Sequence, residues 1–111
     1  MAYSEDNESS APVNVKTFRA RVAHTALAVT ATSGRTSVDS AYDVVRLVNE
    51  GPDKLFFKFT TSTGTAATTD HVLLAGASET FRRVPGTDTH VAAICASGKT
   101  ATLYASSGDG N

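Results

Sequence analysis

The sequence contains no tryptophan, one methionine and one cysteine, Cys95. A single cysteine cannot form a disulfide within the chain, so no internal disulfide framework supports the fold. Cys95 lies in an apolar run, where a thiol behaves as a small hydrophobic side chain, and we expect it to be packed and inert. No apolar stretch reaches the ~18 residues that a membrane-spanning helix requires, and the amino terminus is acidic where a secretory signal would be basic. The sequence therefore predicts a protein made in the cytoplasm.

The chain also lacks an excess of charge of either sign. Its 10 basic and 11 acidic residues leave a formal net charge of −1 at pH 7. Binding to nucleic acid or to an anionic membrane relies on clustered positive charge. Both kinds of partner are therefore disfavoured.

At 111 residues the chain has room for one domain and not for two. We predict a single domain over residues 13–107, with a flexible C-terminal end at residues 108–111. Residues 1–12 carry three carboxylates and three serines, a composition that predicts a flexible N-terminal arm. This arm is either a frayed terminus or a segment, within Met1–Val15, that orders against a neighbouring subunit. Abundant alanine and threonine indicate a thin core, which favours a homo-oligomer.

Residues 42–61 hold two β-prone runs on either side of a marked turn. Four of the five residues in Val44–Val48 are aliphatic, and three of the five phenylalanines fall in Leu55–Phe59. Between them, Asn49–Asp53 contains glycine and proline, which favour a turn. We therefore predict a central hairpin. With a period of two along each strand, the predicted core includes Val45, Leu47, Leu55, Phe57, Phe59, Phe81, Val91, Ala93 and Leu103.

The rest of the chain alternates short apolar runs with turn residues. A helix is the rival for residues 17–28, but frequent valine and threonine and the absence of a capping box favour strands. Turn signals about every ten residues predict seven or eight short strands, in an all-β antiparallel sandwich or a small barrel of jelly-roll type. Beyond the central hairpin, strands are predicted in 13–32 (two), 72–74, 80–84, 89–96 and 100–105, with turns at 33–36 and 85–86, a polar connection at 37–41, a loop at 62–70 and a hairpin loop at 97–99.

No motif in the chain has the spacing of a catalytic or metal site. The histidines His24, His71 and His90 lack the pattern of zinc ligands, although Asp70 and Asp88 lie close to two of them in sequence. We expect His71 in a loop and His90 at a strand end, bonded to the backbone. We therefore predict no enzyme, cofactor or metal; a small hydrolase or a ligand-binding barrel is the rival class.

Two further groupings have structural explanations. Ser97-Gly98-Lys99-Thr100 has the ending of a phosphate-binding loop, but the first glycine of that motif is missing and no helix follows. Arg82-Arg83 is either part of a solvated strand face or one side of an ion pair with a partner's carboxylate.

Three motifs are typical of a known group of proteins. Residues 45–51 read Val-Arg-x-x-Asn-x-Gly, residues 73–79 read Leu-x-Ala-Gly-x-x-Glu, and residues 89–94 read Thr-His-Val-Ala-Ala-Ile, before a Gly-x-Gly end. With these motifs, residues 44–110 resemble small structural proteins encoded among the virion genes of tailed bacteriophages.

The resemblance implies a β-sandwich protein of the virion, made in the host cytoplasm. Its implied role is that of a capsid decoration (cement) protein, which binds and stabilises the shell of the major capsid protein, as a dimer or trimer. A head-to-tail connector, a tail component and a β-sandwich adhesion or receptor-binding module are the alternatives.

Overall fold

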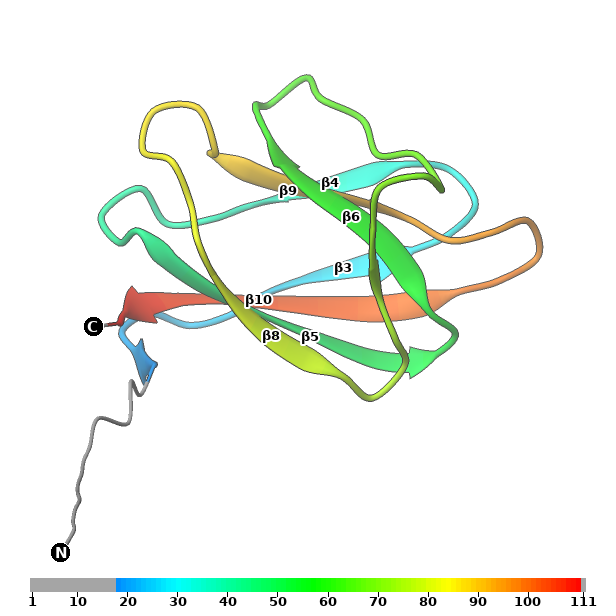
Figure 1. Cartoon of the computed structure of the whole chain (residues 1–111), viewed down its shortest axis with the longest axis horizontal. Coiled ribbons are helices and arrows are strands. Elements are labelled where there is room, and N and C mark those ends of the chain that lie inside the picture. Colours follow the sequence, from blue (N-terminus) through cyan, green and yellow to red (C-terminus); the bar gives the residue numbers. More distant parts are fainter. Residues whose placement is uncertain (1–17, 111) are drawn as a thin grey trace, which may run out of the picture.

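The computed structural model describes residues 18–110, which form two antiparallel β-sheets packed as a sandwich (Figure 1). These residues contain nine strands and no helix, so the predicted all-β sandwich is confirmed with slightly more strands than expected. Accordingly, none of them forms a helix long and apolar enough to cross a membrane. The predicted arm, residues 1–12, lies outside the described residues. The strands are β2 (Arg19–Ala20), β3 (Thr25–Val29), β4 (Gly34–Ser37), β5 (Val44–Pro52), β6 (Leu55–Thr60), β7 (His71–Leu73), β8 (Ser78–Arg82), β9 (His90–Ile94) and β10 (Ala101–Asp109).

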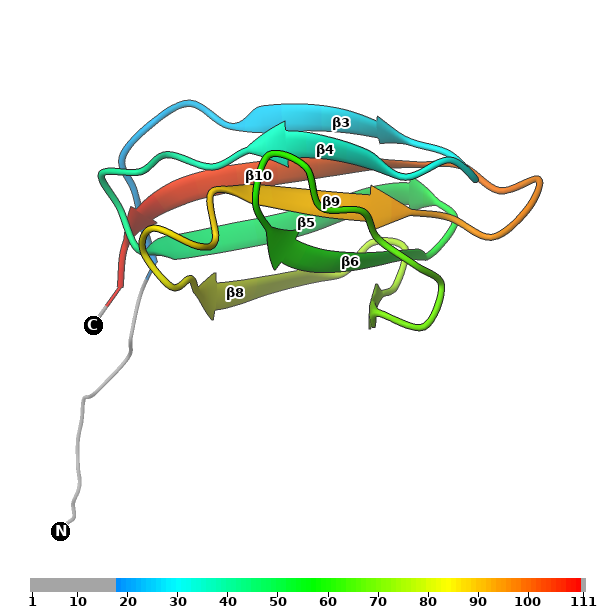
Figure 2. The ribbon, with the colours of Figure 1, turned by 90° about the horizontal axis from the view of Figure 1, so that it is seen from above.

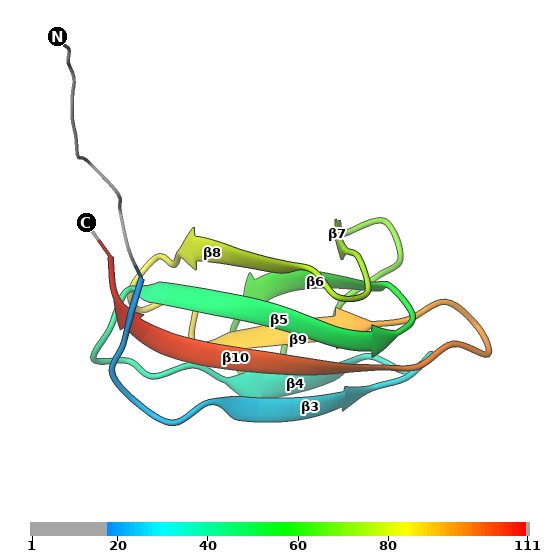
Figure 3. The same cartoon turned by 90° about the horizontal axis from the view of Figure 1, so that it is seen from below.

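Strands β3 to β10 follow a jelly-roll path. The first sheet has the order β3-β10-β5-β8, with the short β2 beside the end of β10, and the second has the order β4-β9-β6-β7. Among strands β3 to β10, only the connection from β6 to β7 stays within one sheet, and the other six connections cross the sandwich. Figure 3 shows β3 and β8 at the two edges of the first sheet. Figure 2 shows β3 and β4 along one side of the sandwich and β6 and β8 along the other.

The core lies between the two sheets, where alternate residues of each strand meet. Leu47, Leu55, Leu73 and Leu103 are completely buried, and burying such a side chain contributes about 1.5–3 kcal/mol. Every residue of the predicted core belongs to this cluster or packs against it. Two predicted core residues, Phe59 and Phe81, are only partly buried.

The predicted central hairpin is wrong, because β5 and β6 lie in different sheets. β5 pairs with β10 and β8, whereas β6 pairs with β9 and β7. The connection is an arch held by the buried side chain of Asn49. Its Oδ1 accepts a hydrogen bond from the Gly51 amide at 2.8 Å, and its Nδ2 donates to the carbonyls of Asp53 and Leu73, each at 3.0 Å. The arch lets the apolar faces of the two strands meet across the core, which pairing side by side in one sheet would prevent.

The predicted closing hairpin is wrong for the same reason. β9 pairs with β4 and β6, and β10 pairs with β2, β3 and β5, so the two strands lie in opposite sheets. Gly98 takes the left-handed conformation that glycine allows in a tight turn, with φ of 78°. The turn was therefore predicted in the correct place, but it connects strands of two different sheets rather than two neighbouring strands of one sheet.

Residues 34–37 form strand β4, although their sequence predicts a turn and a polar connection. β9 provides the pairing partner, from Gly34 opposite Ala93 to Ser37 opposite His90. Because this pairing satisfies the backbone, it overrides the weak β-propensity of glycine and serine. Gly34 also allows β4 to approach β3, since a Cβ there would lie 3.2 Å from the side chain of Leu27.

The last strand is longer than expected and includes part of the predicted flexible end. Gly108 pairs with Ala20 and Asp109 pairs with Arg19. The Asp109 carboxylate also forms an ion pair with Arg21. Gly108 has no room for a side chain, because the carbonyl group of Arg19 occupies the position of a Cβ.

Candidate interaction surface

The three histidines are separated in the fold. His24 packs edge-on against the ring of Tyr104, with centroids 5.1 Å apart. His71 is the first residue of β7 rather than a loop residue. His90 begins β9 as expected, but its Nδ1 lies 2.9 Å from the hydroxyl of Thr89 instead of bonding to the backbone. Within residues 18–110 no group of three or more histidine, cysteine or acidic side chains could hold a metal ion.

Cys95 is packed in the core, as its apolar surroundings predict. Only 1% of the residue is exposed, and its Sγ lies 3.9 Å from the carbonyl oxygen of Val29. Burial, with a smaller contribution from the negative charge of Asp53, raises the pKa of the Cys95 thiol. A thiol that stays protonated is a poor nucleophile.

Residues 97–100, whose sequence is similar to the end of a phosphate-binding loop, form the arch between β9 and β10. The amide of Thr100 donates to the carboxylate of Asp53 at 3.0 Å, and the amide of Lys99 donates to the carbonyl of Ala96. A phosphate loop needs free amides that point at an anion. Here both amides are already used, so the segment has a structural role.

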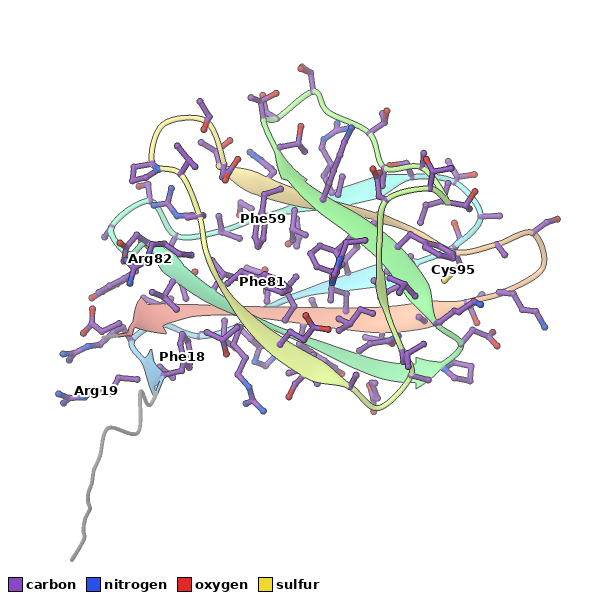
Figure 4. The ribbon with its side chains drawn as sticks, viewed as in Figure 1. Phe18, Arg19, Phe59, Phe81, Arg82 and Cys95 are labelled. Carbon is purple, nitrogen blue, oxygen red and sulfur yellow. The ribbon has the colours of Figure 1, made fainter. Side chains whose placement is uncertain are left out.

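The two adjacent arginines have different environments, which their shared residue type could not predict. Arg82, labelled in Figure 4, is exposed, and it forms an ion pair with Asp43 of the same chain at 2.6 Å. Arg83 is 3% exposed and follows the inward parity of β8. Its guanidinium donates to the carbonyls of Tyr42, Asp39 and Asp88 at 2.8, 3.2 and 3.3 Å. Arg83 therefore ties two loops together and is neither a solvated residue nor one free to meet a partner.

The threonine-rich loop at residues 62–70 is anchored to strand β4 and its preceding turn. The carbonyl of Gly64 accepts a hydrogen bond from Arg35 at 2.9 Å, and the amide of Ala66 donates to the hydroxyl of Ser33 at 2.8 Å. Ala66 is buried, with 7% of its surface exposed. Most other residues of the loop are exposed.

A cleft of ≈ 390 Å³ opens at the end of the sandwich where the two arches lie. Leu74 borders it with 59% of its surface exposed, although sequence reasoning assigned this residue to a strand. Lys54 and Lys99 flank the apolar surface. No local sequence pattern predicts this site, because residues from three separate connections form it. The residues of the cleft are Pro52, Asp53, Lys54, Leu74, Ala75, Ala96 and Lys99.

A second surface, which we call the seam, lies between β6 and β8 and consists of two aromatic rings, Phe59 and Phe81, and two polar side chains, His71 and Glu79. The rings of Phe59 and Phe81 are partly buried, with centroids 5.7 Å apart, and Figure 4 shows both between the two strands. His71 Nε2 lies 3.5 Å from Glu79 Oε1, and both of these side chains are exposed. The seam is the side of the sandwich opposite β3 and β4 (Figure 2).

Comparison with solved structures finds a similar fold in two proteins that share little sequence identity with this chain. The crystal structure of PirA covers 80% of this chain and 96% of its own, with a TM-score of 0.53 and 15% identity. A de novo designed double-stranded β-helix covers 77% of this chain and 97% of its own, with a TM-score of 0.50 and 14% identity. A protein of the disulfide-linked pili of Bacillus endospore appendages is 20% identical, with a lower TM-score of 0.44.

The similarity is one of fold. At such low identity it says nothing about activity. No protein-family model matches the chain, and no curated protein matches its sequence. The features that could carry a function are therefore those of the molecule itself: the cleft, the seam and the exposed loop.

Proposed function

We propose that the protein is a non-enzymatic structural protein of a tailed-bacteriophage virion that decorates the capsid by binding the major capsid protein. The motifs of residues 44–110 support the virion assignment. The jelly roll is compatible with it, because this fold is common in viral capsid domains, although a fold alone does not define a function.

The observation that carries the binding role is the cleft. Leu74 has 59% of its surface exposed, and it lies beside an opening that an inserted side chain can fill. Lys54 and Lys99 flank the opening, while the carboxylate of Asp53 is held by the Thr100 amide. A partner segment with an apolar side chain between carboxylates fits this arrangement.

The non-enzymatic role is supported by how the candidate groups are distributed. Cys95 is buried, and the three histidines each contact a different neighbour rather than a common nucleophile. Hydrolysis of an ester, glycoside or phosphate that is lost on changing His71 or His90 to alanine would overturn this part of the proposal.

Decoration is tested by mixing the purified protein with capsids that lack it and measuring co-sedimentation. Leu74→Glu and the double change Lys54→Glu with Lys99→Glu should each weaken binding at least tenfold. The matched control is Lys58→Glu, which reverses an exposed charge outside the cleft and should leave binding unchanged. Equal binding by all variants would show that the cleft is not the contact.

A cryo-electron microscopy map of the particle separates the alternatives. Density repeated over the icosahedral shell would support decoration. Density only at the neck or tail would instead establish a connector or tail component. Binding of the isolated protein to a host glycan or surface protein would favour an adhesion module.

A further inference from the structure

The first sheet ends in an edge strand, β8. Within residues 18–110, β5 pairs with one side of β8 and no strand pairs with the other. Such an edge presents backbone donors and acceptors that another chain can use. Association of the chain with itself through this edge does not depend on which virion protein is the partner.

The pairing with β5 shows which backbone groups of β8 point outward. The amide of Arg83 donates to the carbonyl of Asp43 at 2.8 Å, and the amide of Asn49 donates to the carbonyl of Ala77 at 3.0 Å. In an antiparallel pair, residues that exchange hydrogen bonds alternate with residues that exchange none. Odd-numbered residues of β8 therefore bond to β5. The even-numbered residues Ser78, Thr80 and Arg82 direct their amides and carbonyls away from the sheet.

The seam lies directly beside this edge. Phe81 of β8 points inward and meets Phe59 of β6 at 5.7 Å, and both rings keep part of their surface exposed. β6 is also open here, because β7 pairs only with Leu55–Phe57 and no described strand covers the same edge at Lys58–Thr60. A strand added to β8 would therefore gain backbone bonds and cover two aromatic rings.

The segment Val13–Thr17 fits this edge. Its sequence, Val-Asn-Val-Lys-Thr, alternates β-branched with polar residues. All five residues have amide protons, and the segment is as long as β8, which has 5 residues. We propose that Val13–Thr17 of a second copy of this chain pairs antiparallel with β8 and covers the seam.

The pairing has one favoured register. Valine and threonine face the seam only if they lie opposite the inward residues of β8, so Val15 lies opposite Phe81. Lys16 then lies opposite Thr80 and bonds to its outward backbone groups. A register shifted by two residues in one direction would require an amide proton from Pro12, which has none. A register shifted by two residues in the other direction would draw Phe18 away from its place beside Gly108.

The added strand must come from another molecule. In this register Thr17 lies opposite Glu79. Glu79 of β8 and Ala105 of β10 lie at the same height along the first sheet, because each of them pairs with Leu47 of β5. Phe18 precedes the pair of Arg19 with Asp109, at the far end of β10. The two places are roughly 13 Å apart along the strands and about 19 Å apart across them, whereas consecutive Cα atoms are about 3.8 Å apart. One chain cannot span that gap between adjacent residues.

Mixing two single-cysteine variants tests the contact directly. Lys16→Cys and Thr80→Cys place two thiols opposite each other, within the separation that a disulfide bridges. Under mild oxidation the mixed sample should form a disulfide-linked heterodimer, identified by mass. Lys99→Cys is the control for Thr80→Cys, because Lys99 is exposed in the connection between β9 and β10, outside β8 and the seam. Cross-linking of Lys16→Cys to both positions equally, or to neither, would overturn the proposal.

Proline substitutions in the full chain provide a second test by sedimentation equilibrium. Lys16→Pro removes an amide that bonds to β8 and should raise the dissociation constant of self-association at least tenfold. Val15→Pro removes an amide that points away from β8 and should have a smaller effect. Lys16→Ala controls for the lost charge. Equal effects of the two proline substitutions, or a wild-type protein that stays monomeric at millimolar concentration, would refute strand addition.

Discussion

Asn49 is the polar residue whose loss should disturb the fold most. It is completely buried, and Nδ2 of its side chain donates to two carbonyls, those of Asp53 and Leu73. Its backbone also bonds to Ala77 and Gly76, at the turn that leads into β8. Asn49→Asp keeps the volume of the side chain but replaces the donor with an acceptor, so it isolates the hydrogen bonds from packing.

The expected loss follows from those two bonds. Each carbonyl left without a donor in the interior costs about 1–3 kcal/mol, and the new carboxylate is itself buried without a cation. We expect the free energy of unfolding to fall by about 3–4 kcal/mol at pH 7, a large part of the 5–15 kcal/mol typical of a domain. Protonation of the introduced carboxyl restores one donor, so the loss should be smaller at about pH 4.

Urea unfolding followed by circular dichroism measures this loss. With a slope of about 1.5 kcal/mol/M, the midpoint should fall by about 2 M. Glu50→Gln is the control, because Glu50 is the exposed neighbour on the same strand and its midpoint should hardly change. A midpoint for Asn49→Asp within about 0.5 M of the wild type at pH 7 would refute the role of Asn49 in the arch.

Three further predictions follow from buried groups. The lysine of Arg83→Lys cannot replace the guanidinium that bonds to three separate carbonyls, so urea unfolding should show a loss of about 1–3 kcal/mol in the free energy of unfolding. Arg82→Lys changes an exposed ion pair and should lower the free energy of unfolding by less than about 1 kcal/mol. Phe57→Ala should cost about 3–5 kcal/mol, and an equal loss for the more exposed Phe56→Ala would contradict the assigned faces of β6. Because burial raises the pKa of Cys95, the folded chain holds that proton more tightly than the unfolded chain, and the free energy of unfolding should fall as pH rises from about 7.5 to 9.5. Cys95→Ala should remove that slope, and an unchanged slope would assign it to other groups.

Alternation along the chain predicted which residues face the core. Leu55 and Phe57 are buried on the predicted face of β6, and Phe81 and Arg83 share the inward parity of β8. The period of two is a local property, so it can be recognised without knowledge of the partner strands. The inward faces of the longer strands were therefore predictable from the sequence alone, whereas β4, which has no such alternation of apolar residues, was not.

The environment of Arg83 was not predictable in this way. Its parity places it inside, but a buried guanidinium requires acceptors, and arginine is rarely buried without them. The acceptors are carbonyls of Asp39, Tyr42 and Asp88, in loops whose positions depend on the whole fold. The cleft has the same origin, since Pro52, Leu74 and Ala96 meet only after the sheets have formed.

The two arches show why pairing was harder to predict than strand location. A hairpin and an arch both need a turn that contains glycine between two alternating strands, so the local sequence is the same for either. They differ in the partner of each strand, and here every partner of β10 lies far away in sequence, at β2, β3 and β5. The last strand fills the centre of the first sheet, between β3 and β5. The first sheet therefore cannot form from consecutive hairpins, and its strands obtain their full hydrogen bonding only when the C-terminal residues are in place.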